Sequence, residues 1–172
     1  NLRIDGDSVM LNPSYSGIDS IVNADFESGM PAGWSASGSS TRAQWTIGTG
    51  VTNPPSGSNY AYIVYPTNGP NPAGDTDILT APAGPITTGT TVLTLNYDYG
   101  FDSGTTDYMT CEVRFFDGSW LAWTEIANYS TDGSGSENID LSANLPADSV
   151  QVRWLYVSPG GKNGQDGAVD NV

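Results

Sequence analysis

Short runs of alternating apolar and polar residues, separated by turn-forming residues, dominate the chain from Ile21 onward. The clearest run is 92–99, in which Leu93, Leu95 and Tyr97 share one face and are predicted core residues. Gly, Pro, Asn and Asp gather between the runs, as they do at the turns of antiparallel sheets. The pattern predicts strands at 21–27, 41–48, 60–65, 76–80, 91–99, 108–116, 121–129, 136–141, 149–157 and 167–172.

The same alternation assigns faces to two further strong strands, 108–116 and 149–157. In 108–116 the residues predicted to face inward are Cys111, Val113 and Phe115, and in 149–157 they are Val150, Val152 and Trp154. The residues predicted to face outward include Glu112, Arg114, Phe116 and Arg153. So many short strands predict an all-β sandwich or barrel of antiparallel sheets. We expect this domain to span 21–172, after an N-terminal extension or linker at 1–20 with a possible edge strand.

The length of 172 residues fits one domain with one core. With 19 acidic and 5 basic residues, the formal charge is −14. That charge opposes the phosphate neutralisation on which nucleic-acid binding depends, and it disfavours anionic membrane surfaces. Clustered carboxylates suit hard cations such as Ca²⁺, although solubility alone is the alternative explanation for them.

The chain contains no histidine and one cysteine, Cys111. Catalysis by Ser-His-Asp or Cys-His groups is therefore excluded, as are His-based metal sites, an internal disulfide and a multi-cysteine zinc site. We expect Cys111 to pack as a small buried apolar residue. Because no apolar run is long enough for a membrane helix, we expect no membrane insertion. The chain begins without methionine and stops within an apparent strand, so we expect it to be part of a longer polypeptide.

The segment Asn23–Trp34 resembles the opening signature "Asn-x-x-Phe-Glu-x-Gly-x-x-x-Gly-Trp" of extracellular jelly-roll domains. It is similar to the choice-of-anchor J and cleaved-adhesin domains, to the MAM domains and, more distantly, to CenC-like carbohydrate-binding modules. Four further matches follow in order: Ser56–Tyr62, Ile78–Pro82, Leu93-x-Leu95-x-Tyr97 and Gly167–Val172. The resemblance covers about 20–172 and implies a two-sheet antiparallel jelly-roll β-sandwich.

The resemblance also implies a structural Ca²⁺ held by the Glu of the first strand and the Asp of the last, here Glu27 and Asp170. Two carboxylates placed so close repel each other unless a cation neutralises them. Strand periodicity adds Asp25, and the turn before Tyr60 adds oxygens from Ser58 or Asn59. The alternative is that Glu27 and Asp170 are ordinary surface carboxylates. The family often has a second Asp where this chain has Asn171.

Further acidic positions are candidates for a second ion. They are Asp75 with Asp77, the loop that contains Asp102 and Asp107, and Asn163 with Asp166. None has the spacing of an EF-hand loop, so we interpret each as solvated turn chemistry.

A carbohydrate module needs flat aromatic rings outside the core, with polar groups that bind sugar hydroxyls. Trp34 and Trp154 are predicted to be buried and Trp45 is ambiguous, which leaves Trp120, Trp123 and Tyr65 as candidate rings. Packing under a loop is the alternative for each ring. Arg114, Arg153 and Asp98 are candidate polar contacts, and cross-strand ion pairing with Asp98 and Glu112 is the alternative for the two arginines.

These observations favour a non-catalytic, secreted or cell-surface binding or adhesion module, stabilised by Ca²⁺, that recognises a glycan or an extracellular protein. A structural spacer domain of a surface adhesin is the alternative. A jelly-roll glycoside hydrolase or lyase needs two suitably placed carboxylates, and Glu112 with Glu125 is the pair to test. We predict no catalytic residue.

Overall fold

The structure is a computed structural model that describes residues 2–5, 8–11, 20–40, 43–65, 74–103, 106–159 and 165–172. Among these residues the regular elements are β-strands and one short 3-10 helix, η1 (Ser142–Asn144). No helix in the described part is long and apolar enough to cross a membrane. The described part of the chain is therefore built from strands, as the alternating pattern predicts.

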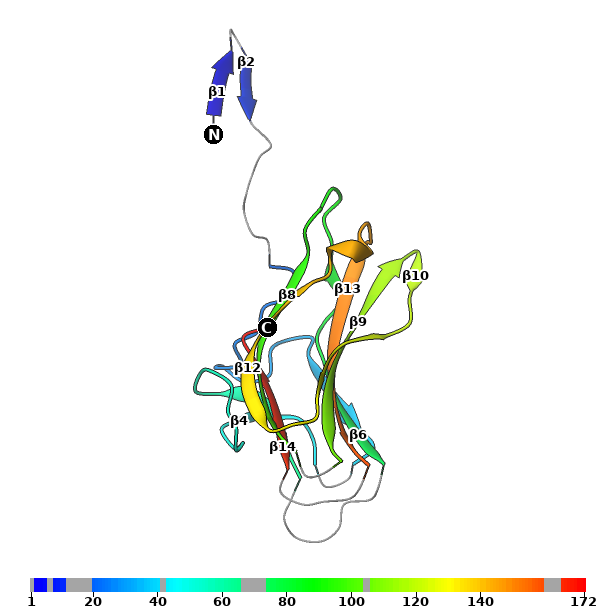
Figure 1. Ribbon diagram of the computed structural model, residues 1–172. Coiled ribbons are helices and arrows are strands. Elements are labelled where there is room, and N and C mark those ends of the chain that lie inside the picture. The colour runs from blue at the N-terminus through cyan, green and yellow to red at the C-terminus, as the bar shows by residue number, and fades with distance from the viewer. Residues whose placement is uncertain are drawn as a thin grey trace.

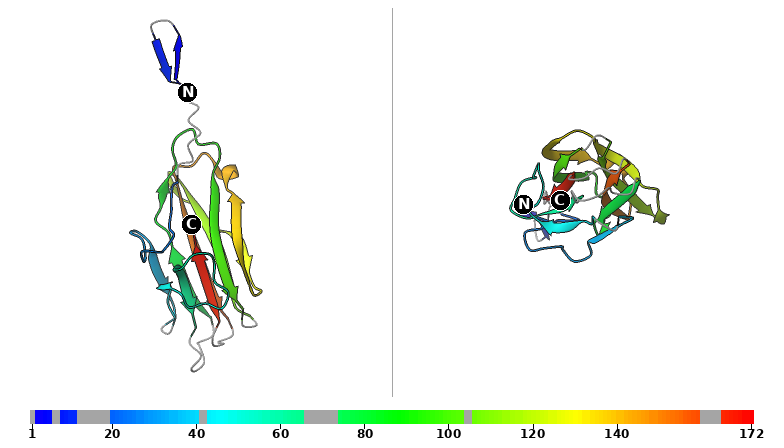
Figure 2. Two further views of the ribbon diagram at one scale, coloured as in Figure 1. Left: turned by 90° about the vertical axis from the view of Figure 1, so that its left-hand side faces the viewer. Right: turned by 90° about the horizontal axis from the view of Figure 1, so that it is seen from below.

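Two antiparallel sheets face each other, and we call them the larger and the smaller sheet (Figures 1 and 2). The larger sheet has the order β10-β9-β13-β6-β3, with β11 also paired to β9 and β7 paired to β13. Its strands are β3 (Ser35–Gly38), β6 (Asp75–Thr80), β7 (Gly84–Pro85), β9 (Tyr108–Asp117), β10 (Ser119–Trp120), β11 (Thr124–Tyr129) and β13 (Ser149–Ser158). The smaller sheet has the order β12-β8-β14-β5-β4. Its strands are β4 (Thr46–Gly48), β5 (Tyr60–Val64), β8 (Thr94–Asp102), β12 (Gly133–Asp140) and β14 (Asp166–Asp170).

The N-terminal strands β1 (Leu2–Asp5) and β2 (Ser8–Leu11) pair with each other as a separate sheet. The sequence predicted an N-terminal extension or linker with a possible edge strand at 1–20, and the described residues of this segment form these two strands. Antiparallel strands joined by a two-residue connection pair locally, without help from the sandwich.

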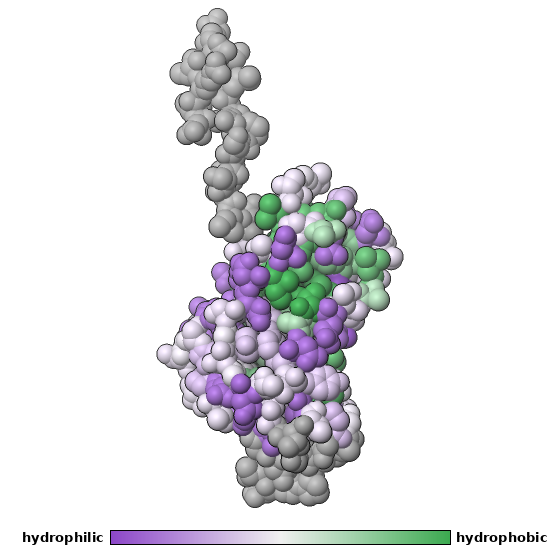
Figure 3. Space-filling model, viewed as in Figure 1, coloured by the Kyte–Doolittle hydropathy of each residue, from purple (hydrophilic) through white to green (hydrophobic). Residues whose placement is uncertain are grey.

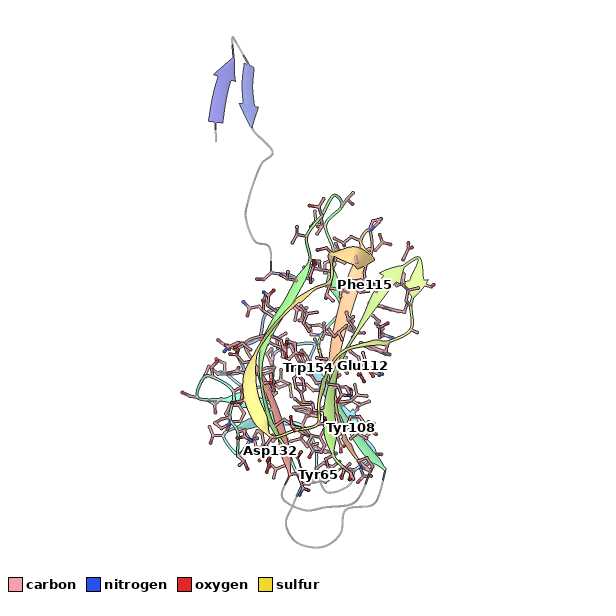
Figure 4. The ribbon with its side chains drawn as sticks, in the orientation of Figure 1. Tyr65, Tyr108, Glu112, Phe115, Asp132 and Trp154 are labelled. Carbon is pink, nitrogen blue, oxygen red and sulfur yellow. The ribbon has the colours of Figure 1, made fainter. Side chains whose placement is uncertain are left out.

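The core between the sheets is centred on aromatic side chains. Trp154 of β13 is fully buried, stacks on Trp34 at 5.9 Å between ring centroids, and meets Tyr97 of β8 edge to face at 5.3 Å. Phe26 packs edge to face on Trp34 at 5.0 Å. Trp154 thus joins both sheets to the segment that precedes β3 (Figure 4).

The predicted inward residues of the strong strands are confirmed. Leu93, Leu95 and Tyr97 are buried. The inward residues of β9 and β13 are buried as well: Cys111, Val113, Phe115, Val150, Val152 and Trp154. Burial raises the pKa of the Cys111 thiol well above its ordinary value, so it packs as the expected apolar residue. Trp45, ambiguous from sequence, is buried, and its Nε1 donates to the Asp77 carbonyl at 3.1 Å.

One predicted strand is wrong, because residues 21–27 form no strand. Phe26 has φ +53°, a left-handed conformation that an extended strand does not contain. Pairing is limited to Ala24 and Val172, which exchange backbone hydrogen bonds of 3.0 and 2.9 Å. The fold class is as expected: an all-β, antiparallel, two-sheet sandwich.

Candidate functional site

The two ends of the sandwich domain meet at Glu27 and Asp170. The bonds between Ala24 and Val172 hold the two segments together, and Phe26 and Asn171 beside them have φ values of +53° and +49°. Left-handed backbone is costly for a bulky residue such as Phe and persists where surrounding structure enforces it. Here complete burial of the Phe26 ring enforces it, and the turn brings Glu27 toward the end of β14.

Glu27 is bound by the turn that precedes β5. Its Oε1 accepts the backbone N–H groups of Ser58 at 2.7 Å and Asn59 at 3.1 Å, and the Asn59 side chain donates to Oε2 at 3.3 Å. The backbone bonds, Ser58 first, lower the pKa of Glu27 and keep it a carboxylate. In this structure the turn presents N–H groups to Glu27, and the supply of oxygens by Ser58 or Asn59 to a cation stays a prediction.

Asp170 has the opposite environment. It is fully buried, and neither carboxylate oxygen has a hydrogen bond of ordinary geometry. Burial raises the pKa of Asp170 to about 6; the backbone N–H of Asn171 opposes this rise, and the charges of Glu27, Asp98 and Asp25 add to it. A buried, unpaired carboxylate beside other carboxylates lacks a positive partner.

Gly57 shows how closely the two acidic groups approach. A Cβ atom at this residue would lie 2.6 Å from Asp170 Oδ2 and 3.0 Å from Glu27 Oε1, so both oxygens border the same small space. Its φ of +87° is also one that side chains disfavour. Glycine at this turn therefore leaves that space open.

Asp98 lies beside this pair and away from the predicted ligand face. It is opposite Asp170 in the β8–β14 register, accepts the Asn171 amide at 2.8 Å, and is hydrogen-bonded by the hydroxyls of Ser56 and Ser136. Burial acts to raise the pKa of Asp98, but the bonds from Ser136, Ser56 and Asn171 outweigh it and lower the pKa. Asp98 lies on the other sheet from the two arginines, so the structure does not bring these predicted ligand residues together.

Asp25 also differs from the expectation. It is exposed and does not share a strand face with Glu27, because no strand forms there; instead its Oδ1 accepts the Glu27 N–H at 3.2 Å. Among the described residues, no three His, Cys, Asp or Glu side chains are already grouped as a metal site. The acidic pair Glu27 and Asp170 therefore needs other oxygens to complete the shell of a hard cation.

A second candidate site lies on the outer face of the larger sheet. Glu125 of β11, Glu112 of β9 and Arg153 of β13 occupy one row across the three strands, since Glu112 is the register partner of both others. Arg153 donates to Glu112 Oε2 from Nε at 2.7 Å and Nη2 at 2.5 Å. The predicted cross-strand ion pair is confirmed for Arg153 and Glu112. Figure 4 shows Glu112 on β9 and Trp154 toward the interior.

Arg114 has no carboxylate as its hydrogen-bond partner in this region. It donates to Gln151 Oε1 from Nε at 3.0 Å and Nη2 at 2.6 Å, and its guanidinium lies 4.5 Å from the ring centroids of both Trp120 and Trp123. Arg153 lies 4.2 Å from the Trp123 centroid. Four of the predicted ligand residues, Trp120, Trp123, Arg114 and Arg153, therefore come together, and we call them the Trp-Arg cluster.

Trp120 is the more accessible ring of the Trp-Arg cluster. It is 37 % exposed, on the short strand β10, and packs edge to face on Phe116 at 5.4 Å between centroids. Trp123 is partly buried in the connection between β10 and β11. Arginine against indole rings holds the rings in place, and a held, exposed ring loses little entropy when a ligand stacks on it.

Tyr65 does not belong to this face, which corrects the sequence prediction. Its ring is fully buried and stacks on Tyr156 at 5.3 Å, and its hydroxyl donates to Asp77 Oδ2 at 2.5 Å. Asp75, Asp77, Asp107 and Asp166 are likewise buried, so the interpretation of these positions as solvated turns is wrong. Asn163 lies outside the described residues.

An open cleft of about 300 Å³ lies between the sheets near Val172. Its lining is mostly aliphatic and includes Ile21, Leu93 and Val152. Apolar side chains also gather near the end of the sandwich at which β13 begins (Figure 3). The cleft contains no aromatic ring among its lining residues and does not include the Trp-Arg cluster, so it is the weaker candidate for a sugar.

Comparison with known proteins gives structural neighbours only. No protein-family model and no curated protein matches the sequence. The solved structure of TmCBM61 in complex with β-1,4-galactotriose aligns with a TM-score of 0.58 and 14% identity, covering 86% of this chain and 91% of that one. A structure of carbohydrate-binding modules from the β-sandwich superfamily, with promiscuous specificity, aligns with a TM-score of 0.54 and 16% identity, covering 87% and 60%.

The K3 cleaved adhesin domain of Lys-gingipain from Porphyromonas gingivalis w83 aligns over 88% of this chain and 95% of that one, with a TM-score of 0.49 and 16% identity. At such low identities, the alignments with TmCBM61 and with the promiscuous modules show a shared jelly-roll β-sandwich and nothing narrower. The resemblance to the choice-of-anchor J family stays a prediction.

Proposed function

We propose that this chain is a non-catalytic glycan-binding module whose ligand stacks on the Trp-Arg cluster. The observation that carries the proposal is the fixed, partly exposed Trp120 ring beside two guanidinium groups on one outer sheet face. Indole rings stack on the apolar faces of sugars, while Arg, Gln and Glu side chains bind hydroxyl groups. The structural neighbours named above as carbohydrate-binding modules support the same class of function.

The charges on this face favour binding over hydrolysis. Hydrolysis of a glycosidic bond requires one carboxyl group that holds a proton. Glu112 is register partner to Glu125, but Arg153 donates to Glu112 Oε2 through two contacts of 2.7 and 2.5 Å, and Glu125 is exposed. The Glu112 side chain is therefore engaged in an ion pair on the sheet face. We therefore assign Glu112 to the support of the binding face.

The proposal includes a structural Ca²⁺ at Glu27 and Asp170, in an extracellular setting. Two features support the ion: the orphaned, buried oxygens of Asp170 and the open space beside Gly57 that both carboxylates border. Asp98 is the third anionic group at this end. A bound Ca²⁺ would neutralise Asp170 and fix the turn that carries Ser58.

Glycan-array screening followed by calorimetry tests the binding function. We expect the wild-type chain to bind at least one oligosaccharide class, and Trp120→Ala to weaken that binding at least tenfold, which is about 1.4 kcal/mol. Trp120→Phe keeps a ring and should lose less. Glu137→Gln, on the other sheet, is the matched control and should bind as the wild type does.

The competing role of a spacer domain predicts a different result. A spacer gives no glycan hit at millimolar concentrations while its melting temperature still rises with CaCl₂. That outcome would contradict the proposed glycan binding and would support the proposed Ca²⁺ site. Oligosaccharide shortening during the incubation would instead show hydrolysis.

A further inference from the structure

The outer face of the smaller sheet carries two pairs of aspartates, one at each end of a shared loop. In the β8–β14 register, Asp98 lies opposite Asp170 and Asp102 lies opposite Asp166. Between these pairs Gly100 lies opposite Ala168, and a Cβ atom on Gly100 would lie 1.8 Å from the Asn53 carbonyl oxygen. The loop at 50–59 therefore packs directly on the two strands, and the small residues beneath it permit this contact.

The Asp166 end of this loop differs in detail from the Asp170 end. Asp166 is only 2% exposed, and its Oδ2 accepts both the backbone N–H of Thr52 at 2.8 Å and the Thr52 hydroxyl at 2.9 Å. Its Oδ1 is buried and has no hydrogen-bond partner. One oxygen of this carboxylate thus fixes the loop, and the other is left unsatisfied.

Two more carboxylates act on Asp166. Asp102 is its direct register partner, and Asp132 lies before β12, at the lower end of the molecule in Figure 4. Burial first, and then the charges of Asp102 and Asp132, raise the pKa of Asp166, although the Thr52 bonds oppose this. Like charges placed opposite each other in a sheet are destabilising.

Hydrogen bonds within the protein do not satisfy this cluster. The Ser103 N–H donates to Asp132 Oδ1 at 2.7 Å. Both Thr52 bonds go to Oδ2 of Asp166, so its buried Oδ1 is left without a hydrogen-bond partner. Among the residues whose side chains are described, the cationic ones are Arg114 and Arg153, and both lie on the larger sheet.

We propose that Asp102, Asp132 and Asp166 bind a second hard divalent cation of the Ca²⁺ class, at the opposite end of the 50–59 loop from Glu27 and Asp170. All three side chains offer oxygen, the ligand that such cations prefer, and Ca²⁺ fills the rest of its shell with water or carbonyl groups. The three carboxylates are not already closed around one point, so binding draws Asp102 and Asp132 over Asp166. The loop is then held at both ends.

Counting bound ions tests this site independently of glycan binding. The full chain is dialysed against radioactive CaCl₂ at pH 7, and calorimetry gives the affinities. We expect two ions per wild-type chain, one in Asp102→Asn/Asp132→Asn, one in Asp170→Asn, and two in the exposed control Asp148→Asn. Excess MgCl₂ should compete with Ca²⁺ for the site at Asp102, Asp132 and Asp166, because Mg²⁺ is also a hard cation that prefers oxygen ligands.

Asparagine keeps the shape of the side chain, and circular dichroism in EDTA checks that each variant is folded. Asp132→Asn alone changes an exposed side chain and should weaken the second ion at least tenfold. A wild-type count of one that Asp170→Asn abolishes would overturn the proposal. So would a double variant that binds as many ions as the wild type with the same affinities. Loss of glycan binding with both ions retained would bear on the Trp-Arg cluster alone.

Discussion

Replacing Asp170 by Asn should stabilise the cation-free protein at neutral pH. Asp170 is fully buried with two unpartnered oxygens, and its pKa is raised to about 6 from the ordinary 3.8. The native state therefore binds more protons than the unfolded state between these values, and stability falls as pH rises through this window. Asparagine at position 170 cannot ionise, so the variant does not lose this stability as pH rises.

The pKa shift sets the size of the effect. A rise of about two units corresponds to roughly 3 kcal/mol at pH 7, and solvent screening near the exposed Glu27 and Asp25 reduces this to on the order of 1–2 kcal/mol. In Ca²⁺ we expect the wild type to be the more stable of the two proteins. The ion stabilises the native wild type by RT ln(1 + [Ca²⁺]/Kd) at this site, and the variant lacks this stabilisation.

Urea denaturation of the wild type and Asp170→Asn at pH 4 and pH 7.5, in EDTA and in CaCl₂, measures the eight free energies of unfolding. We expect the wild type in EDTA to be less stable at pH 7.5 than Asp170→Asn, and the two to converge at pH 4. Asp148→Asn controls for the loss of one negative charge. If the variant is less stable than the wild type in EDTA at pH 7.5, and Ca²⁺ stabilises neither chain, then Asp170 is not a destabilising buried carboxylate and binds no cation.

Two other substitutions separate the cation site from the core and from the ligand face. Gly57→Ala places a Cβ atom 2.6 Å from Asp170 Oδ2 at a φ of +87°, so we expect a loss of about 1–3 kcal/mol and weaker Ca²⁺ binding by calorimetry. Gly118→Ala, at a φ of +67° but with open space around it, shows the backbone cost alone. Tyr65→Phe removes the hydroxyl that donates to Asp77, and should lower the free energy of unfolding by about 1–3 kcal/mol without changing glycan affinity. Reduced glycan affinity in a folded Tyr65→Phe protein would contradict the placement of this ring in the core.

Alternation along the chain predicted the strong strands well because it records burial directly. In β9 and β13, every second side chain packs between the sheets, so the inward residues could be read without knowing which strands are neighbours. The segment Ser35–Gly38 carries no such signal, because all four residues of β3 are exposed. β7 and β10 contain two residues each, too few for a period to show.

The sites depended on pairing between distant strands, which alternation does not reveal. Arg153 and Glu112 meet because β13 lies beside β9, and Asp98 faces Asp170 because β8 lies beside β14. Sequence alone placed Asp98 with the arginines, since all three were outward on strong strands. Asp166 and Asp102 were named from the sequence as candidates for a second ion, but in separate groups, because the partners of Asp166 come from β8 and the 50–59 loop.

The indole N–H signals of the five tryptophans report whether a glycan binds at the Trp-Arg cluster. In ¹H–¹⁵N spectra recorded during titration with an oligosaccharide from the array, we predict that Trp120 and Trp123 shift, while the buried Trp34, Trp45 and Trp154 stay in place. Saturable binding that leaves Trp120 and Trp123 unmoved, or that instead shifts backbone signals around the aliphatic cleft near Val172, would contradict the account.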